Sequence, residues 1–436
     1  MEASQRGSGS PGGPPSVVIV GGGFAGLSAL SALKGSGAAV TLVDRNVYST
    51  FQPLLYQVAT AGLTSADVAY ALWSATRKAG ALFHKGALTE IDFAGRVVRL
   101  DDGSEMPYDY LILATGVSAS FFGIPGAVEN TMSLYTRRDA IALRERLLIE
   151  LESRSWGGNK ADLTLTIAGG GATGVELAGT LAELRNIALP AAFPAIDPAT
   201  VKVTLIERAP ALITAFKPRE QEYARQQLLK RGVDVRLGAT IKEVTPDGVL
   251  LADGSTVPSV LTVWAAGVAA PDAIEHLGLA SGHNGRLKVG KDLRIEGQDR
   301  VFATGDISVD TDDPVAQLAQ PAIQQGRHAA RQVRRLIAGQ QTQPFSYHDK
   351  GTMATIGRAS AVVELPIGIR LRGLLAWLAW LGLHLVTLLG GRNRIVALVN
   401  LSWRYLTWGR SGGIIIGDDQ LAADRATDRA PERAEI

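Results

Sequence analysis

The sequence is short of sulfur and of net charge, and both shortages limit what the protein can do. Its 436 residues include no cysteine, and 44 basic residues nearly balance 42 acidic ones, which leaves a net charge of +2. Without cysteine the chain cannot form a disulfide, present a redox thiol or bind a metal through thiolates, although this does not identify a compartment. The charge balance gives no reason to expect a nucleic acid as partner, and we predict no metal site.

Both ends of the chain lack the apolar residues that a folded element needs. Residues 1–15 are rich in glycine, serine and proline and contain no apolar run of the signal-peptide kind, so we predict a disordered leader. Residues 418–436 are charged and alanine-rich, which predicts a solvated, disordered tail. The length between these ends allows two or three domains with large cores.

A dinucleotide-binding motif opens the middle part of the chain. Residues 17–33 read VVIVGGGFAGLSALSAL, which predicts a buried strand, a GxGxxG turn and a helix over residues 25–34. The first glycine makes the tight turn, the second lets phosphates approach the backbone, and the third lets helix and strand pack closely. These glycines are Gly21, Gly23 and Gly26. The next strand, residues 38–43, leads to Asp44, an acid at the spacing expected for binding a ribose hydroxyl.

The same unit occurs a second time. A strand predicted over residues 163–168 is followed by a helix over 175–184 and by a strand over 201–206 that leads to Glu207. Between the first strand and the helix stand the glycines of a second GxGxxG, namely Gly169, Gly171 and Gly174. Residues 98–116 and 249–267 also match, because each reads as a strand, a DGS turn and a second strand that closes on glycine. A repeat of this complexity predicts two dinucleotide-binding folds, and electron transfer from a nicotinamide to a flavin would explain why they are paired.

The second fold differs from the first in one insert, residues 186–200, which contains three prolines. Its acid, Glu207, would bind a ribose 2′-hydroxyl and repel a 2′-phosphate, which favours NADH over NADPH. The neighbouring Arg208 weakens that preference, because an arginine can accept the phosphate.

Several single residues have both a functional and an ordinary interpretation. Asp306, at the end of VFATGD, suits the ribityl hydroxyls of a flavin but also suits a turn. Gln320 and Gln324 begin a helix predicted to about residue 336 and share one side of it, facing either a flavin or solvent. Glu176 lies in the first turn of the second helix, where it would be a surface carboxylate or a proton relay. Residues 46–60 are either a buried connector or a wall over the cofactor.

The C-terminal region changes composition. Residues 373–391 form a 19-residue stretch without Asp, Glu, Lys or Arg, and residues 395–410 are amphipathic. The arginines that flank the uncharged stretch are Arg370, Arg372, Arg392 and Arg394. Three interpretations fit this pattern: a helix pair lying in a membrane interface, a helix spanning the bilayer, and a buried core or dimer interface.

Over residues 16–417 these motifs together resemble those of the type II NADH dehydrogenases, the NADH:quinone oxidoreductases that pump no protons. Pieces such as GGGFAG, LILATG, GGGATGVELAG, VWAAG and VFATGD are common to many flavoproteins. FQPLLYQVAT, AQPAIQ and AWLAWLGLHLVTLLGGRNR are far more specific, and KGTMATIGR also matches. Some members carry a lysine after the GR of that last motif, near the flavin, but here Ser360 follows in GRASAV, so we assign no catalytic lysine there.

The resemblance implies FAD in the first fold, NADH as substrate in the second, and a membrane quinone, ubiquinone or menaquinone, as electron acceptor. It assigns FAD to Gly21, Gly23, Gly26, Asp44 and Asp306, and NADH to Gly169, Gly171, Gly174 and Glu207. It makes Gln320 and Gln324 the border of the quinone site and Glu176 a proton-relay candidate. We expect further cofactor contacts from residues in or beside the same motifs, namely Phe24, Ala25, Arg45, Gln52, Thr115, Gly116, Thr173, Gly267 and Ala322.

The expected architecture is α/β, with two Rossmann-like dinucleotide-binding domains and a C-terminal membrane-associating helical segment. We predict an FAD-binding domain over residues 16–125 and 295–345, an NADH-binding domain over 126–294 and the C-terminal region over 346–417. The resemblance implies a peripheral, monotopic protein on the cytoplasmic face of the cell membrane, where lipid is a partner and a homodimer is an open alternative for the apolar surface.

Two other functions fit parts of the pattern. One is a soluble NAD(P)H-dependent reductase of ferredoxin or rubredoxin, and the other is an NADH-sensing flavoprotein without turnover. The soluble reductase gives no reason for the apolar composition of residues 373–410. Disulfide reductases, cysteine-dependent NADH peroxidases and sulfide:quinone oxidoreductases are excluded, because all of them need redox thiols.

Overall fold

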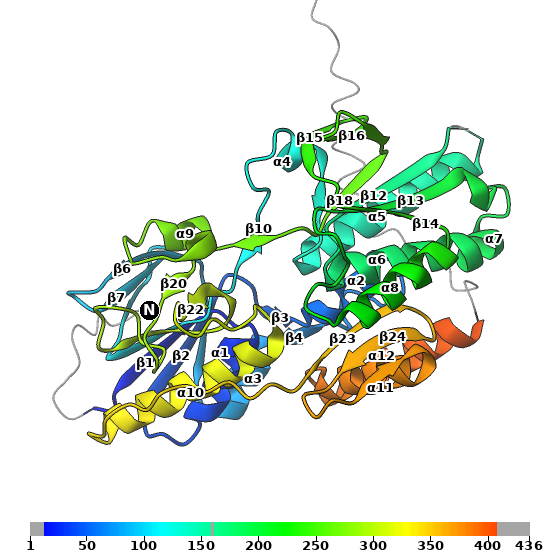
Figure 1. Ribbon diagram of the computed structural model, residues 1–436. Helices are drawn as coiled ribbons and strands as arrows, with labels where there is room; N and C mark the ends of the chain where they lie inside the picture. Colours follow the sequence, from blue (N-terminus) through cyan, green and yellow to red (C-terminus); the bar gives the residue numbers. More distant parts are fainter. Residues whose placement is uncertain (1–12, 158–160, 408–436) are drawn as a thin grey trace, which may run out of the picture.

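The computed structural model describes residues 13–157 and 161–407 and is shown in Figure 1. Most of the predicted leader, Trp408, Arg410 and the predicted tail lie outside the described residues. Two parallel sheets stand apart in the view, and the orange C-terminal elements lie beneath the second sheet. The chain therefore forms two units, each built on a parallel sheet, and a C-terminal region that packs on the second unit.

The first sheet has five strands, and every neighbouring pair runs parallel. In sheet order they are β21 (Val301–Ala303), β9 (Tyr110–Leu113), β1 (Ser16–Val20), β2 (Ala39–Asp44) and β5 (Leu82–Lys85). The central strands are buried on both faces, which explains why their sequences are continuous apolar runs. Helices α1 (Phe24–Leu33) and α10 (Ala319–Ile337) pack together beside this sheet.

The second sheet repeats the first. Its strands, also parallel, are in order β11 (Met132–Ser133), β18 (Leu261–Trp264), β12 (Leu163–Ala168), β13 (Val201–Glu207) and β14 (Val233–Leu237). Its long helices are α5 (Arg137–Ser155), α6 (Ala172–Glu183) and α8 (Pro218–Lys230). A capping box at Thr136 starts α5, and α6 continues through a π-helical turn, Leu184–Ala188, into the insert.

The two DGS turns lie in matching three-stranded antiparallel sheets. The first consists of β6 (Leu88–Asp92), β7 (Val97–Leu100) and β8 (Glu105–Pro107), and the second of β15 (Ile241–Thr245), β16 (Gly248–Leu251) and β17 (Thr256–Pro258). The chain crosses between the halves through an antiparallel pair, β10 (Ser118–Ala119) with β19 (Val268–Ala269). After this crossing Ala270, Leu287 and Leu293 already pack in the core of the first sheet. The return to the first sheet therefore begins ahead of residue 295.

Shorter elements complete the two halves. The strands are β3 (Tyr48–Thr50), β4 (Ala69–Ala71), β20 (Leu287–Lys288) and β22 (Ser308–Val309). The helices are α2 (Leu55–Ala59), α3 (Leu72–Ala79), α4 (Ala127–Asn130), α7 (Leu189–Ala192) and α9 (Asp272–Glu275). Turns of 3₁₀ helix cover Gln52–Leu54, Pro198–Thr200, His283–Gly285 and Gly305–Ile307.

The C-terminal region is a three-stranded antiparallel sheet followed by two helices. Its elements are β23 (Thr352–Gly357), β24 (Ser360–Glu364), β25 (Arg370–Arg372), α11 (Gly373–Thr387) and α12 (Gly391–Thr407). The uncharged stretch is therefore one helix that ends before Gly390, whose φ of +86° turns the chain into α12. A Cβ added to Gly390 would lie 3.2 Å from the Tyr70 ring. Among the helices that the structure describes, none combines the length and apolarity needed to cross a bilayer.

The C-terminal helices share a core with the second sheet. Ala376, Trp377 and Trp380 of α11 and Leu401 of α12 belong to the same buried cluster as the strands of that sheet. Outward residues of both helices are exposed instead. The exposed apolar side chains are Leu374, Leu375, Leu378, Leu383, Val386, Ile395, Leu398, Val399 and Trp403. The region thus has one face in the protein core and one apolar face in solvent.

Candidate functional site

The first glycine loop has the geometry that its sequence predicts. Gly21 has a φ of +108°, and a side chain on it would overlap the Ala114 carbonyl. A side chain on Gly26 would overlap the Gly21 carbonyl oxygen, because α1 passes directly over the turn. Only glycine fits either position, since one needs a left-handed conformation and the other a close backbone approach.

The second loop repeats these contacts. Gly169 has a φ of +111°, and its added Cβ would lie 2.6 Å from the Ala265 carbonyl oxygen. A side chain on Gly174 would overlap the Gly169 carbonyl, just as one on Gly26 would overlap that of Gly21. The internal repeat in the sequence is therefore a repeat of backbone geometry.

Both loops leave room and donors for a pyrophosphate. Helix α1 begins after Gly23 and α6 after Gly171, and neither start is capped by a side chain. A Cβ added to Gly23 or Gly171 would meet nothing within 4 Å. Open space at an uncapped helix N-terminus suits a phosphate, which accepts hydrogen bonds from the amide groups there. The residues present therefore fit a dinucleotide at each loop. In the second loop Thr173 is exposed in the first turn of α6.

The two acids lie under their loops in the same way. Asp44 accepts hydrogen bonds from the amides of Gly22 (2.6 Å) and Asn46 (2.7 Å). Glu207 accepts them from Gly170 (2.5 Å) and Ala209 (2.6 Å). Each carboxylate oxygen keeps a lone pair for a ribose hydroxyl. Burial raises the pKa of Asp44, while these two amide hydrogen bonds oppose the rise.

Asp306 faces a residue that the sequence pattern did not reveal. Burial raises the pKa of Asp306, and the Arg286 guanidinium opposes this. Burial and then the charge of Asp306 raise the pKa of Tyr135 to about 12, while a hydrogen bond with Gln52 and the charge of Arg45 lower it. Asp306, Gln52 and Arg45 are predicted cofactor residues from two distant segments, and Tyr135 is the group they share. A lone tyrosine after a two-residue strand carries no motif, so sequence reasoning missed it.

The two predicted glutamines at the start of α10 differ in their hydrogen bonds. The Oε1 atom of Gln320 is buried and has no hydrogen-bond partner in the described structure, as expected of a group that awaits a ligand. Gln324 instead donates to the His348 carbonyl (2.9 Å) and accepts from the His348 amide (3.0 Å). A third glutamine, Gln325, accepts from the Gly305 amide at 2.8 Å and thereby holds the turn that carries Asp306.

The other predicted cofactor residues lie beside α1 or directly after strands β9 and β18. Phe24 packs against the buried cluster of Ala25, Ala114 and Ala322. Thr115 and Gly116 are half-buried after β9, and Gly116 has a φ of +68°. Gly267, after β18, lies against the Phe122 ring and has no space for a side chain.

Residues 51–60 are buried and also border the first loop. Phe51 is 5% exposed and Tyr56 is 2% exposed, within the core of the second half. The Phe51 ring meets the Phe24 ring edge-on at 5.8 Å. The segment is therefore a buried connector that also contacts α1 beside the first loop, and its role as a wall over the cofactor stays a prediction.

Glu176 is enclosed between the second half and the C-terminal region. It lies on α6 and is 8% exposed, and its Oε1 atom accepts a hydrogen bond from the Thr355 amide of β23 at 3.3 Å. Burial raises the pKa of Glu176 to about 8, and the Thr355 amide and the Trp380 indole oppose the rise. The carboxyl therefore holds its proton at neutral pH, as a proton donor must.

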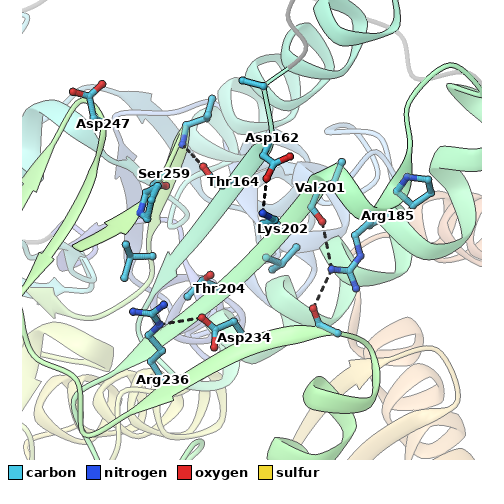
Figure 2. Close-up of a pocket in the computed structure, with 18 of the residues that line it drawn as sticks. Asp162, Thr164, Arg185, Val201, Lys202, Thr204, Asp234, Arg236, Asp247 and Ser259 are labelled. Atoms are coloured by element: carbon cyan, nitrogen blue, oxygen red, sulfur yellow. Dashed lines mark hydrogen bonds and ion pairs between the residues drawn. The ribbon is translucent and has the colours of Figure 1, made fainter. Parts of the chain in front are cut away.

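A cavity of about 1040 Å³ lies elsewhere, at the amino edge of the second sheet (Figure 2). Several of its charged side chains are already engaged: Lys202 pairs with Asp162, and Arg236 pairs with Asp234 at 2.9 Å. Arg185 donates to the Gly232 carbonyl at 3.0 Å. This cavity contains none of the predicted site residues, and we assign it no ligand.

Comparison with known proteins gives one consistent result. Residues 15–326 match the pyridine nucleotide-disulphide oxidoreductase family. The chain is 35% identical over 437 residues to the type II NADH:quinone oxidoreductase Ndh of Mycobacterium tuberculosis, covering 96% of this chain and 94% of that protein. A second protein of that organism, the type II NADH:quinone oxidoreductase NdhA, is 36% identical to this chain. The alignment covers 93% of this chain and 90% of NdhA. The structure of NDH2 from Plasmodium falciparum in complex with NADH superposes with a TM-score of 0.83 at 18% identity, covering 91% and 99%.

Proposed function

This chain belongs to the type II NADH:quinone oxidoreductases, and from that premise we propose which of its residues hold the cofactor, the substrate and the proton. The reaction oxidises NADH and reduces a quinone, and FAD, when bound, accepts a hydride and passes two electrons on. The overall balance, NADH and quinone plus one proton giving NAD⁺ and quinol, requires a proton beyond the hydride. The protein's own task is to bind, to orient and to supply that proton.

In the proposed arrangement the first glycine loop and Asp44 hold FAD, and the second loop and Glu207 hold NADH. The support is the room at the two uncapped helix starts and the placement of each acid beneath its loop. Asp306, with Tyr135 beside it, would bind the flavin side chain. Gln320 has the buried oxygen without a partner, so we assign it, and not Gln324, the contact with the ligand at this end of α10.

Glu176 carries the proton in this proposal. The single observation behind it is the buried carboxyl between α6, β23 and α11, whose pKa is raised to about 8 by burial. A carboxyl that is neutral at pH 7 can give its proton to a quinone oxygen as electrons arrive, and take one back afterwards. Replacement by glutamine keeps the shape and removes the proton.

An anaerobic flavin spectrum tests this assignment. We expect NADH to bleach the flavin of the purified protein and a short-chain quinone to restore it. Glu176→Gln should bleach at a near-normal rate but recover about 10²-fold more slowly, as when a general acid is removed. Gln324→Ala is the matched control and should recover nearly as fast as the parent. Normal recovery in Glu176→Gln would refute the proton role, and bleaching without recovery in the parent would point to a protein as acceptor.

We also propose that the exposed apolar face of α11 and α12 lies on the cytoplasmic surface of the cell membrane. Two asparagines of α12 dock that helix on the first half: Asn393 donates to the Ala69 carbonyl at 2.7 Å, and Asn400 donates to Asp67 at 2.9 Å. Their outward leucines and valines remain exposed, as in a helix that lies in an interface. NADH is a cytoplasmic coenzyme, which favours that side of the membrane.

Vesicle flotation distinguishes a membrane face from a dimer interface. The double variant Leu378→Glu/Val399→Glu should lose binding to vesicles that contain anionic lipid, while NADH still bleaches its flavin. Glu129→Gln, on exposed α4, is the control and should bind as the parent does. If the double variant binds vesicles normally but changes from dimer to monomer, the face is an interface between copies.

A further inference from the structure

Helix α11 does more than present an apolar face, because it brings an indole to the Glu176 carboxyl. Trp380 is 1% exposed, and its Nε1 atom is buried and forms no hydrogen bond of normal geometry. The same N–H lies close enough to Glu176 to lower the pKa of that carboxyl against the effect of burial. Trp380 is thus a buried donor without a partner of its own, on the helix beside the group to which we assign the proton.

The indole is held in place from several sides. The His384 ring stacks on it at 4.1 Å between centroids with an angle of 26°, and the Tyr56 ring lies 6.2 Å away. His384 Nδ1 lies 2.7 Å from the Trp380 carbonyl oxygen, so the proton is on Nδ1 because a carbonyl only accepts. The Phe51 ring meets His384 edge-on at 6.2 Å. These contacts fix the rotamer of Trp380 against α6.

The start of α11 is also tied to the second half. Arg372, directly before the helix, lies 3.5 Å from Glu220, which is fully buried on α8. Glu364 of β24 accepts a hydrogen bond from the Lys217 amide at the start of α8 at 3.0 Å. The C-terminal helix therefore has a fixed position relative to α8, which itself packs against α6.

We propose that Trp380 is a positioning residue for Glu176, whose indole N–H stabilises the carboxylate and whose ring excludes water from the carboxyl. The proposal rests on the proposed proton role of Glu176. The N–H acts on the ionised form and the ring acts by desolvation, so the two parts of one side chain have opposite effects on proton affinity. A residue that only fills space would not show opposite effects.

Few other groups can titrate near this carboxyl. On α11 the neighbour is His384, whose pKa is lowered to about 4 by burial, so it stays neutral through the range where Glu176 titrates. On α2 it is the Tyr56 phenol, which accepts a hydrogen bond from Gln57 at 3.0 Å. Thr355 of β23 contributes an amide, and the Glu183 carboxylate, two helical turns along α6, accepts a hydrogen bond from the main-chain amide of Arg358. No nearby charge contributes to the shift at Glu176.

Two substitutions separate the effects. Trp380→Phe keeps the ring and removes the N–H, so the titration midpoint of Glu176 should rise by about 1 pH unit. Trp380→Ala removes the ring, admits water and should lower the midpoint by at least about 1 unit. Trp377→Phe, on the same helix and in the same core, is the control and should leave the midpoint unchanged.

The midpoint is read by infrared titration of the protonated carboxyl band in the flavin-loaded protein, assigned by difference from Glu176→Gln. The pH profile of quinone reduction is the second readout, and its alkaline limb should move with the infrared midpoint. Shifts of the same sign in Trp380→Phe and Trp380→Ala, or no shift in Trp380→Phe, would overturn the proposal. A third outcome separates the two proposals. If the infrared midpoint moves as expected in the Trp380 variants, but the pH profiles of quinone reduction are the same in the parent and in Glu176→Gln, Trp380 is still the positioning residue. Only the proton role of Glu176 is then refuted.

Discussion

The two glycine loops are nearly interchangeable, whereas the helices that follow them are covered by different parts of the chain. Helix α1 is crossed by α10, where Gly326 approaches so closely that a side chain would overlap the Ala25 carbonyl. Helix α6 is crossed by β23, where a side chain on Gly179 would overlap the Ile356 carbonyl. The residue two places beyond the last loop glycine is Ser28 in the first helix and the buried Glu176 in the second. The element packed over the helix, and not the loop, therefore distinguishes the surroundings of Glu176 from those of its counterpart Ser28.

The largest effect is expected where the loops are most alike. Gly26→Ala and Gly174→Ala each force a Cβ into a backbone carbonyl, at a cost of about 3 kcal/mol in the free energy of unfolding. If the halves bind their ligands separately, Gly26→Ala will purify without flavin, and Gly174→Ala will keep flavin that NADH no longer bleaches. Flavin absorbance and anaerobic bleaching check both.

The matched controls are Gly23→Ala and Gly171→Ala, where an added Cβ meets open space. These should keep the fold and weaken only ligand affinity. A Gly174→Ala variant that NADH bleaches normally would contradict the packing argument.

The next effect tests the difference between Glu176 in α6 and Ser28 in α1. The pKa of this carboxyl is 4.5 in the unfolded chain and about 8 when folded, so between these values the folded state binds more protons. The free energy of unfolding should then fall by up to about 1.4 kcal/mol per unit as the pH rises from 4.5 to 8. Glu176→Gln should remove this part of the slope, while Ser28→Ala should leave it unchanged. Denaturant unfolding at several pH values measures the slope, and equal slopes in Glu176→Gln and the parent would contradict the burial argument.

A smaller effect tests the packing of β23 against α6. Gly179→Ala pushes α6 away from β23 and should cost about 1–3 kcal/mol in stability. The equivalent position in the first helix is Ser31, which is exposed, so Ser31→Ala should be neutral or stabilising by about 0.5 kcal/mol. Thermal unfolding compares the two, and equal losses would show that both helices are covered alike.

The smallest effect sharpens the difference between the acids. Glu207→Gln removes a negative charge that would repel a 2′-phosphate, so the ratio of kcat/KM for NADPH to that for NADH should rise about tenfold. Asp44→Asn should leave that ratio unchanged and weaken flavin retention instead. A ratio that moves in Asp44→Asn would mean that the assignment of the two loops is reversed.

Local spacing in the sequence predicted the glycine turns and the placement of Asp44 and Glu207, because a strand, a turn and a helix start lie within one short segment. It did not reveal Tyr135 or Trp380, since each acquires its neighbours only when distant segments pack together. Helical spacing put Gln320 and Gln324 on one side, yet the backbone at His348 occupies the second amide. The segment that contains His348 runs beside α10, and the apolar periodicity of the helix does not predict this contact.

The shared core of α11 and the second sheet decides how a detergent-free form of this enzyme must be engineered. Truncation before α11 would strip Ala376 and Trp380 from that core and open Glu176 to water, so the product would be a different catalyst and not a soluble copy. Resurfacing is the workable design, in which only outward side chains such as Leu375, Leu378 and Val386 become polar. The C-terminal helix pair is here an architectural part and not a removable tag.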